Sequence, residues 1–364
     1  MQTMEPSDVA AVRLTNQRIV GKKHKTPVDV VRWMGAMQAQ DYGQAVWAIG
    51  QRLQKPSLAA VEEALADGSI LRTWPMRGTI HFVPSEDAKW MVNLMSARPL
   101  ATDKRRADML GLTHQTYDVC RKLLQEALAG RKLLSRPAIM QLFEDNGIST
   151  AGQRGYHILW YLAQTCVICI GPMDGKQQTF ALLDEWAANT RELSHEEALY
   201  ELAVRYVQSH GPVTTQDFAT WTHMKLSDIK QALQLASDKL KPVQIEGTEY
   251  WIARDSSTTG VPPTGVQLLP GFDEYLLGYK GRSAMLDLEH ATKVVPGGNG
   301  VFFPMLVVDG KICGTWKRTV KAKTVGITVT PFVDTPLNKA DLAVEAARYG
   351  EFLGLEANLS INKL

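Results

Sequence analysis

In several parts of the chain, apolar residues recur three and four positions apart, and two short apolar runs then flank a turn. The clearest part begins at residues 195–208, where the spacing predicts an amphipathic helix that ends before Gly211-Pro212. Thr214 and Ser227 are typical N-caps of two more helices. The predicted helices are 195–208, 218–221 and 229–240, and the predicted strands are 243–245 and 250–252. Three helices followed by a hairpin are typical of a winged helix-turn-helix.

Two earlier parts of the chain repeat this order of elements with a period of about 80 residues. The second copy has predicted helices at 117–129, 135–145 and 153–164, and strands at 167–170 and 179–182. The first copy has predicted helices at 8–19, 28–37 and 58–67, and strands at 70–74 and 79–83. Ser135 followed by Pro137 is a favourable helix start, because proline fits the first turn. The repeat therefore predicts three winged-helix domains in one chain.

The composition changes after Arg254. A segment rich in Ser, Thr, Pro and Gly at 256–265 predicts a linker, and Asp309-Gly310 further on is a strong hairpin signal. The predicted strands here are 266–269, 276–279, 300–308, 311–316, 325–329 and 357–361, with one helix at 337–352. This last part of the chain therefore predicts a small β-barrel or curled sheet with one helix.

The predicted fold class is α+β and mostly helical, with three tandem winged-helix domains and a C-terminal β-barrel-like domain. The predicted domains are 1–97, 98–193, 194–260 and 261–364, the last with one helix. The chain has 364 residues, of which 45% are hydrophobic and 21% charged, as in soluble globular proteins. The N-terminal segment lacks the pattern of a secretory signal, and no apolar run is long enough for a membrane span. We therefore expect a cytoplasmic protein with no membrane partner.

The charge is nearly balanced, with 40 basic and 38 acidic residues, but it is unevenly distributed. Basic residues concentrate in 98–136 and again in 311–323. The first group is Arg98, Lys104, Arg105, Arg106, Arg121, Lys122, Arg131, Lys132 and Arg136, and the second is Lys311, Lys317, Arg318, Lys321 and Lys323. Solvated helix faces and a charged hairpin would explain them equally well. Combined with three winged helices, they favour a nucleic-acid partner.

The four cysteines are too few for a disulfide framework. Cys166 and Cys169 have the spacing of a redox or zinc motif, but their neighbours are apolar and no second ligand pair completes a site. We expect all four, including Cys120 and Cys313, to be buried thiols that pack as small hydrophobic groups. We expect no metal and no other cofactor.

Gln38 and Gln40 flank one small apolar residue. In a helix their side chains would diverge, whereas in an extended chain they would point the same way, and Gly43 makes a loop credible here. From the residues alone, a polar helix end with two solvated glutamines is the favoured interpretation. Asp41 is a candidate supporting residue because it follows the pair directly.

Three further groups carry candidate chemistry. In an extended strand Arg77, Thr79 and His81 share one face, where Arg77 could contact phosphate and His81 could either approach the glutamines or be structural. Asp273 and Glu274, taken as strand residues, face opposite ways, so we expect structural roles, one of them paired with Arg282 or Lys280. The tryptophans nearest the glutamines, which are Trp33, Trp47 and Trp74, could stack on a base but are more often core residues.

The sequence resembles the AlkZ/YcaQ winged-helix superfamily of bacterial DNA glycosylases over nearly its whole length. The resemblance rests on four segments, which are Gln38-Ala39-Gln40, the hairpin at 72–81, the run Leu-Leu-Pro-Gly-Phe-Asp-Glu-Tyr-Leu-Leu-Gly-Tyr at 268–279, and Gly-Thr-Trp-Lys-Arg at 314–318. The Gln-x-Gln signature is similar to that of the AlkZ branch, while the YcaQ branch has Asp as its last member. Asp41 is outside the signature position.

The resemblance implies a monofunctional DNA glycosylase that hydrolyses the N-glycosidic bond of alkylated purines, including N7 and N3 adducts. It also implies action on bulky adducts or interstrand crosslinks. Gln38 and Gln40 would be catalytic, with Asp41 and His81 as candidate support. The expected DNA-binding residues are Arg77, Thr79, Lys317, Arg318, Arg105 and Arg106. The partner would be double-stranded DNA carrying alkylated bases, bound by a bacterial monomer that is nucleoid-associated when on DNA.

Two other classes compete with this one. A winged-helix regulator without chemistry would usually be a dimer that reads a palindrome. A protein-interaction module would have no affinity for DNA even at low salt. Release of free base from alkylated DNA distinguishes the glycosylase from both.

Overall fold

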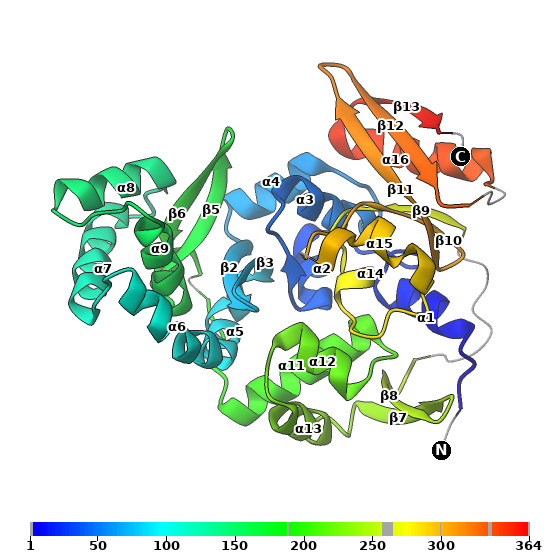
Figure 1. Ribbon diagram of the computed structural model, residues 1–364, viewed down its shortest axis with the longest axis horizontal. Coiled ribbons are helices and arrows are strands. Elements are labelled where there is room, and N and C mark those ends of the chain that lie inside the picture. Colours follow the sequence, from blue (N-terminus) through cyan, green and yellow to red (C-terminus); the bar gives the residue numbers. More distant parts are fainter. Residues whose placement is uncertain (1–2, 188, 257–264, 299, 334–336, 363–364) are drawn as a thin grey trace. The chain divides into compact units, whose positions relative to one another are not determined.

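The computed structural model describes residues 3–187, 189–256, 265–298, 300–333 and 337–362 (Figure 1). The chain forms two compact units. Unit 1 contains Met1–Val61, Leu199–Trp221 and Lys225–Leu364, and unit 2 contains Glu62–Ala198 and Thr222–Met224. The linker predicted at 256–265 lies mostly outside the described residues. The four-domain division remains a prediction.

Unit 1 brings the N-terminal helices together with the last part of the chain. Its helical part consists of α1 (Asp8–Asn16), α2 (Pro27–Met34), the two-residue strand β1 (Met37–Gln38), α3 (Tyr42–Gln51), α11 (His195–His210), α12 (Thr215–Thr222) and α13 (Leu226–Leu235). The hairpin β7 (Leu240–Ile245) and β8 (Thr248–Ala253) follows α13. Its turn is formed by Glu246 and Gly247, both with positive φ, as a tight two-residue hairpin requires. The predicted order of three helices and a hairpin is therefore present in 195–253.

The rest of unit 1 is a five-stranded sheet, curled into a half-barrel, with one long helix. The strands are β9 (Val266–Leu269), β10 (Met305–Val308), β11 (Lys311–Val320), β12 (Thr324–Pro331) and β13 (Glu356–Ile361), in the order β13-β12-β11-β10-β9. Only the β12–β13 pair is parallel, because α16 (Lys339–Leu353) connects them. Both edge strands, β13 and β9, contact α16, which fits a sheet that curls around this helix (Figure 1). Short helices α14 (Glu274–Leu277), η2 (Leu288–His290), α15 (Ala291–Val294) and η3 (Pro296–Gly298) lie between β9 and β10.

Unit 2 is built on a sheet whose strands follow the order β3-β2-β5-β6-β4. The strands are β2 (Ile70–Met76), β3 (Thr79–Pro84), β4 (Leu134–Ser135), β5 (Ile168–Asp174) and β6 (Gln177–Leu182). The helices are α4 (Leu58–Ala66, which spans the unit boundary), η1 (Ser85–Asp87), α5 (Ala88–Met95), α6 (Ala97–Met109), α7 (His114–Leu128), α8 (Arg136–Asp145), α9 (Arg154–Gln164) and α10 (Leu183–Trp186). Ser135 caps α8 as predicted, accepting a hydrogen bond from the Ala138 amide at 3.4 Å.

Several local predictions were wrong, and short apolar segments account for most of them. The segment 276–279 is not the predicted strand, because Asp273 caps α14 through the Tyr275 amide and the first two of these residues end that helix. The helix predicted to run to Leu240 ends at Leu235, and Leu240 begins β7 instead. Its N-cap is Lys225 rather than Ser227. A four-residue apolar run fits either a turn of helix or a strand, so periodicity alone could not decide these cases.

The core of unit 1 contains a buried ion pair in which all donors of one arginine are used. Arg52 donates two hydrogen bonds of 2.9 Å to the two carboxylate oxygens of Asp273, and both side chains are fully buried. Arg52 also donates to the Ala48 carbonyl at 2.8 Å. Two further bonds go to Gln17, one to its backbone carbonyl at 2.9 Å and one to its side-chain oxygen at 2.7 Å. A guanidinium has five N–H donors, so none is left unsatisfied. The pair thus joins α3 and the segment after α1 to the start of α14.

The four thiols are free and no disulfide is present among them. Cys120 and Cys169 are buried as predicted, whereas Cys166 and Cys313 are only partly buried, which corrects the prediction for those two. Burial raises the pKa of each thiol, to about 12 for Cys120 and Cys169 and to about 11 for Cys166 and Cys313. Such thiols are poor nucleophiles at neutral pH.

Within the described ranges, no helix combines the length and hydropathy that a bilayer crossing requires. No group of three or more His, Cys, Asp or Glu side chains suited to a metal ion occurs among the same residues.

We predict that Arg52→Leu destabilises the protein by about 3–5 kcal/mol, because it leaves Asp273 buried without its counter-charge. The matched control is Arg32→Leu, which breaks the exposed pair between Arg32 and Asp29 at 3.1 Å and should cost at most about 1 kcal/mol. Thermal melting followed by circular dichroism measures both. Equal melting temperatures for the two variants would contradict the assigned role of the buried pair.

Candidate active site

The segment that carries Gln38 and Gln40 is extended, as the catalytic interpretation requires. Gln38 lies in β1, Ala39 is fully buried, and Asp41 begins the following helix. Gln38 is half-buried and Gln40 is exposed. The two glutamines are therefore accessible and the alanine between them is buried, as expected where side chains alternate between the two faces of an extended backbone. Both amide side chains are accessible from outside unit 1.

Two glycines fix where this segment starts and ends. Gly35 follows α2 with a φ of 79°, a conformation that favours glycine, and a Cβ there would lie 3.7 Å from the Trp221 ring. Gly43 is in the first turn of α3, where a Cβ would lie 2.4 Å from Nη2 of Arg318. The non-helical segment predicted from Gly43 ends at Asp41, and Gly43 itself lies in α3, where it provides room for a guanidinium.

The N-terminus of α3 bonds to the half-barrel. Arg318 on β11 donates to the Gly43 carbonyl at 2.9 Å and to the Tyr349 hydroxyl at 2.5 Å. The Gly271 amide donates to Oε1 of Gln44 at 3.0 Å. Asp41, the candidate supporting residue, is exposed and caps α3 by accepting a bond from the Gln44 amide at 3.3 Å. Arg318, predicted to bind DNA, thus has contacts that fix the segment following the two glutamines.

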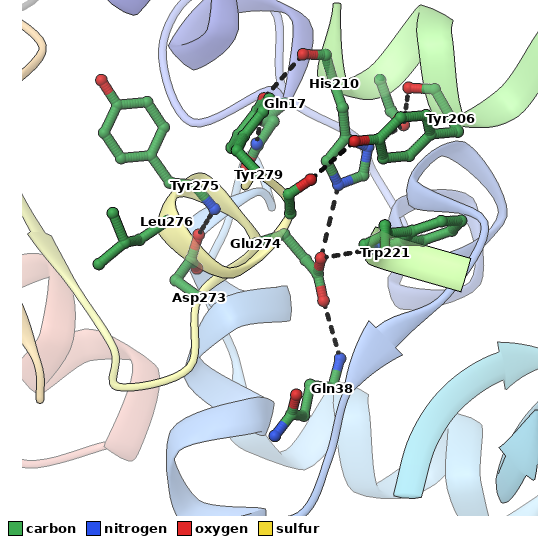
Figure 2. Close-up of polar contacts among 12 residues, drawn as sticks. Gln17, Gln38, Tyr206, His210, Trp221, Asp273, Glu274, Tyr275, Leu276 and Tyr279 are labelled. Carbon is green, nitrogen blue, oxygen red and sulfur yellow. Dashed lines mark hydrogen bonds and ion pairs between the residues drawn. The ribbon is translucent and has the colours of Figure 1, made fainter. Parts of the chain in front are cut away.

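A buried carboxylate lies directly behind Gln38. Oε1 of Glu274 accepts a hydrogen bond from the Gln38 backbone amide at 3.1 Å, and Oε2 accepts one from Nε1 of Trp221 at 2.9 Å (Figure 2). Nε2 of His210 lies 3.5 Å from Oε2. Glu274 and His210 are 1% and 0% exposed, so this carboxylate has no access to solvent or DNA.

The partners predicted for this pair of acids were wrong. Asp273 and Glu274 are the cap and first residue of α14 rather than strand residues, and Asp273 pairs with Arg52 instead of Lys280 or Arg282. Arg282 donates to the carbonyls of Leu276 and Tyr279. The sequence does contain a signal for this arrangement. The two acids stand between Phe272 and a run of apolar residues, which indicates burial, and buried charges need buried partners.

Stacked aromatic rings surround His210 and Trp221. Tyr206 stacks on His210 and on Trp221, with ring centroids 4.7 Å apart in each case. The Tyr206 hydroxyl donates to the Gly278 carbonyl at 2.7 Å, and the Tyr279 hydroxyl donates to the His210 carbonyl at 2.7 Å (Figure 2). Burial raises the pKa of both phenols well above the usual value. This packing holds the side chains around Glu274 in one arrangement.

In unit 2, Arg77 lies in the turn between β2 and β3 and not in a strand as predicted. Arg77 and Gly78 both have positive φ, which forms a two-residue hairpin turn. Nη2 of Arg77 is 2.9 Å from Nε2 of His81, and Nδ1 of His81 is 2.9 Å from the Thr79 carbonyl. Because the guanidinium and the carbonyl fix donor and acceptor, His81 is neutral with its proton on Nδ1. This buried histidine therefore supports the hairpin, and Thr79 and Arg77 are half-exposed.

The remaining predicted DNA-binding residues are exposed. Arg105 and Arg106 lie on α6, a helix with no buried residue, and Lys317 lies on β11. Of the candidate stacking residues, Trp47 and Trp74 are core residues, while Trp33 is half-buried and donates to the Asn16 carbonyl at 2.7 Å.

The family model of AlkZ-like DNA glycosylases matches residues 31–352. The chain belongs to the AlkZ-like family of DNA glycosylases. It is 26% identical over 339 residues to an interstrand DNA cross-link repair glycosylase of Streptomyces sahachiroi, covering 90% of each chain. The solved structure of Streptomyces sahachiroi DNA glycosylase AlkZ is similar with a TM-score of 0.83 and 26% identity, over 100% of each chain.

Membership of this family decides between the classes that the sequence left open. The AlkZ-like protein is an enzyme, a DNA glycosylase that acts on damaged DNA, rather than a regulator or an interaction module without chemistry. The α+β fold class is confirmed, whereas the number of winged-helix domains remains a prediction. Sequence reasoning missed His210 and Trp221, because neither forms a motif with Glu274 along the chain.

We predict that this glycosylase loses stability as the pH falls from 7 to 5.5, with a contribution from His210. Burial lowers the pKa of His210 below its ordinary value of 6.5, against the opposing effect of the Glu274 carboxylate. The unfolded chain then binds more protons than the folded chain below that value, so stability decreases with falling pH.

Melting temperatures at pH 7, 6.5, 6 and 5.5 and constant ionic strength measure this slope. His210→Gln should reduce it, and His195→Gln, at an exposed position, should keep the wild-type slope. Equal slopes in the wild type and His210→Gln would refute the assignment.

Proposed function

We propose that this AlkZ-like glycosylase hydrolyses the N-glycosidic bond of purines alkylated at N7 or N3 in double-stranded DNA, with a water molecule positioned by Gln38 and Gln40. The observation that carries the proposal is the extended segment itself. Two accessible amides flank a buried alanine. The Gln38 backbone amide donates to Glu274, and the Gln44 amide donates to Asp41 at the start of α3. The Gln-x-Gln signature of the AlkZ branch supports the same assignment.

Hydrolysis of this N-glycosidic bond depends more on the position of the attacking water than on a strong acid or base. A purine alkylated at N7 or N3 is cationic and leaves without strong general-acid help. The enzyme then has to hold a water near C1′ and stabilise the positive charge that develops on the sugar. Amide oxygens accept hydrogen bonds from the water and direct negative dipoles at this charge. Neutral amides are weak bases, so rate enhancement in this proposal comes from placement.

The proposal extends to bulky adducts and interstrand crosslinks. The Streptomyces sahachiroi relative is named an interstrand DNA cross-link repair glycosylase, and this chain aligns with 90% of it. A crosslinked base cannot leave the duplex for a closed pocket in the way that many glycosylases require. A half-buried Gln38 and an exposed Gln40 are suited to a substrate that stays in the duplex. We also propose a monofunctional enzyme, since we assign no lysine as a Schiff-base nucleophile.

We predict that Gln38→Ala and Gln40→Ala each lower the single-turnover rate of N7-methylguanine excision by about 10²-fold or more, because the water is no longer held. DNA affinity should change by less than about 3-fold, since neutral amides contribute little to phosphate binding. Rates are measured by release of free base from a duplex with one adduct.

The matched control is Gln54→Ala, a change of another exposed glutamine in unit 1, and it should excise at the wild-type rate. Wild-type excision by the Gln38→Ala/Gln40→Ala double variant would rule out the proposed role of the amides. The same variants assayed on a nitrogen-mustard crosslink test the extension to crosslinks.

We predict that exposed cations on both units bind DNA phosphates. The logarithm of the binding constant falls linearly with the logarithm of the salt concentration, and each phosphate contact adds about 0.9 to the size of this slope. Removing one cation that binds a phosphate should therefore lower the size of the slope by about 0.9. Arg105→Ala/Arg106→Ala and Lys317→Ala should therefore lower the slope by about 1.8 and 0.9 respectively. Fluorescence anisotropy with undamaged duplex at several salt concentrations provides the measurement.

Arg32→Ala is the control, because Arg32 is exposed but pairs with Asp29 at 3.1 Å. An unchanged slope in the Arg105→Ala/Arg106→Ala variant would remove α6 from the DNA-binding surface.

A further inference from the structure

The Gln38 backbone is bonded to a residue 236 positions away in the sequence. The acceptor is Oε1 of Glu274, and the N–O distance is 3.1 Å. Figure 2 shows the carboxylate on one side of the Gln38 backbone and the Gln38 side chain directed away from it. The hydrogen bond therefore acts on the main chain that carries the amide and leaves the amide itself accessible.

Glu274 cannot take part in the reaction directly. Its side chain is 1% exposed, and its two oxygens face protein groups of Gln38, Trp221 and His210. A general acid or base must reach the substrate or a bound water. A role in catalysis for this carboxylate must consequently be exerted through the residue to which it is bonded.

We propose that Glu274 is a positioning residue for Gln38, which holds the Gln38 peptide so that its side-chain amide meets the attacking water. This inference rests on the proposed function, since it assumes that Gln38 positions that water. A hydrogen bond to a carboxylate is stronger than one to a neutral acceptor. A displacement of about 1 Å at a reacting group can reduce a rate about 10²-fold, so the position of this peptide controls turnover.

The arrangement around the carboxylate requires two acceptor oxygens. Oε1 receives the Gln38 N–H and Oε2 receives the Trp221 N–H. A glutamine has one acceptor oxygen and one NH₂ group, so it would place donor against donor at one of these positions. Aspartate keeps both acceptors but is one methylene shorter. The amide substitution at Glu274 must therefore lose one of the two bonds although it keeps the size of the side chain.

The side chains around Glu274 pack closely against two glycines. Nε1 of Trp221 bonds Glu274, and the Trp221 ring also lies 3.7 Å from where a Cβ of Gly35 would be. The His210 ring packs against Gly278, where a Cβ would be 2.6 Å from Cδ2 of the imidazole. The same group of side chains thus contacts both the turn before β1 and the peptide of Gln38.

The test compares two neighbouring acid-to-amide changes, Glu274→Gln and Asp273→Asn. Both acids are buried, but Asp273 bonds Arg52 and the Tyr275 amide and does not bond the glutamine segment. Each variant is assayed for thermal melting, for Kd on a duplex with one N7-methylguanine, and for single-turnover excision from that duplex.

We expect Glu274→Gln to slow excision by about 10- to 100-fold while Kd changes by less than about 3-fold. Asp273→Asn should lower the melting temperature and keep the excision rate within about 3-fold of the wild type. In a double-mutant cycle, adding Glu274→Gln to Gln38→Ala should slow excision no further, because the group that is positioned has already been removed. Glu274→Asp, which retains both acceptor oxygens, should recover part of the rate.

Three outcomes would overturn the inference. They are wild-type excision by folded Glu274→Gln, equal slowing by Asp273→Asn, and full additivity with Gln38→Ala. If Glu274→Gln does not fold, Trp221→Phe removes one of the two donors and keeps an aromatic ring, and a wild-type rate in that variant overturns the inference as well. Unchanged excision by Gln38→Ala would instead refute the proposed function, so the two failures are distinguishable.

Discussion

Two adjacent buried acids organise unit 1, and each has its own set of partners. Asp273 is neutralised by Arg52, whose remaining donors bond the segment after α1 and helix α3. Glu274 accepts bonds from the backbone of the glutamine segment and from α12. Removing a carboxylate from water is costly unless its oxygens find donors, so these partners have no low-energy alternative position. The acids therefore connect residues from three separate stretches of sequence.

In this arrangement, the residues that fix the geometry of the site differ from those proposed to contact DNA. The groups that fix the geometry are buried and charged, while the groups proposed to meet DNA are accessible and either neutral, as Gln38 and Gln40 are, or cationic, as on α6. Arg318, which the sequence predicts to bind DNA, also has a structural role. It belongs to a basic run in the sequence, yet its guanidinium bonds the Gly43 carbonyl and the Tyr349 hydroxyl. A site of this kind gains its order from the protein interior rather than from the substrate.

Local features of the fold could be predicted from the sequence where local chemistry decides the conformation. Asp309-Gly310 predicted a hairpin because both residues tolerate positive φ, and both have it. Ser135 and Pro137 predicted the start of α8. The prediction failed at 276–279, where a short apolar run fits either structure. The glutamine spacing allowed an extended chain at 38–40 but did not decide for it, and Met37, predicted to end a helix, lies in β1. The hydrogen bond from the Gln38 amide to Glu274 depends on tertiary structure, so the spacing could not predict it.

Unit 1 is made of three separate stretches of sequence, and this affects the order in which the chain can fold during translation. Residues 62–198 of unit 2 emerge as one continuous stretch, whereas Met1–Val61 leaves the ribosome long before Asp273 and Glu274 have been made. Domains generally fold as units in the order of synthesis. The N-terminal segment, including both glutamines, must therefore wait until Asp273 and Glu274 have been made before it can take its final conformation, whereas unit 2 can fold earlier.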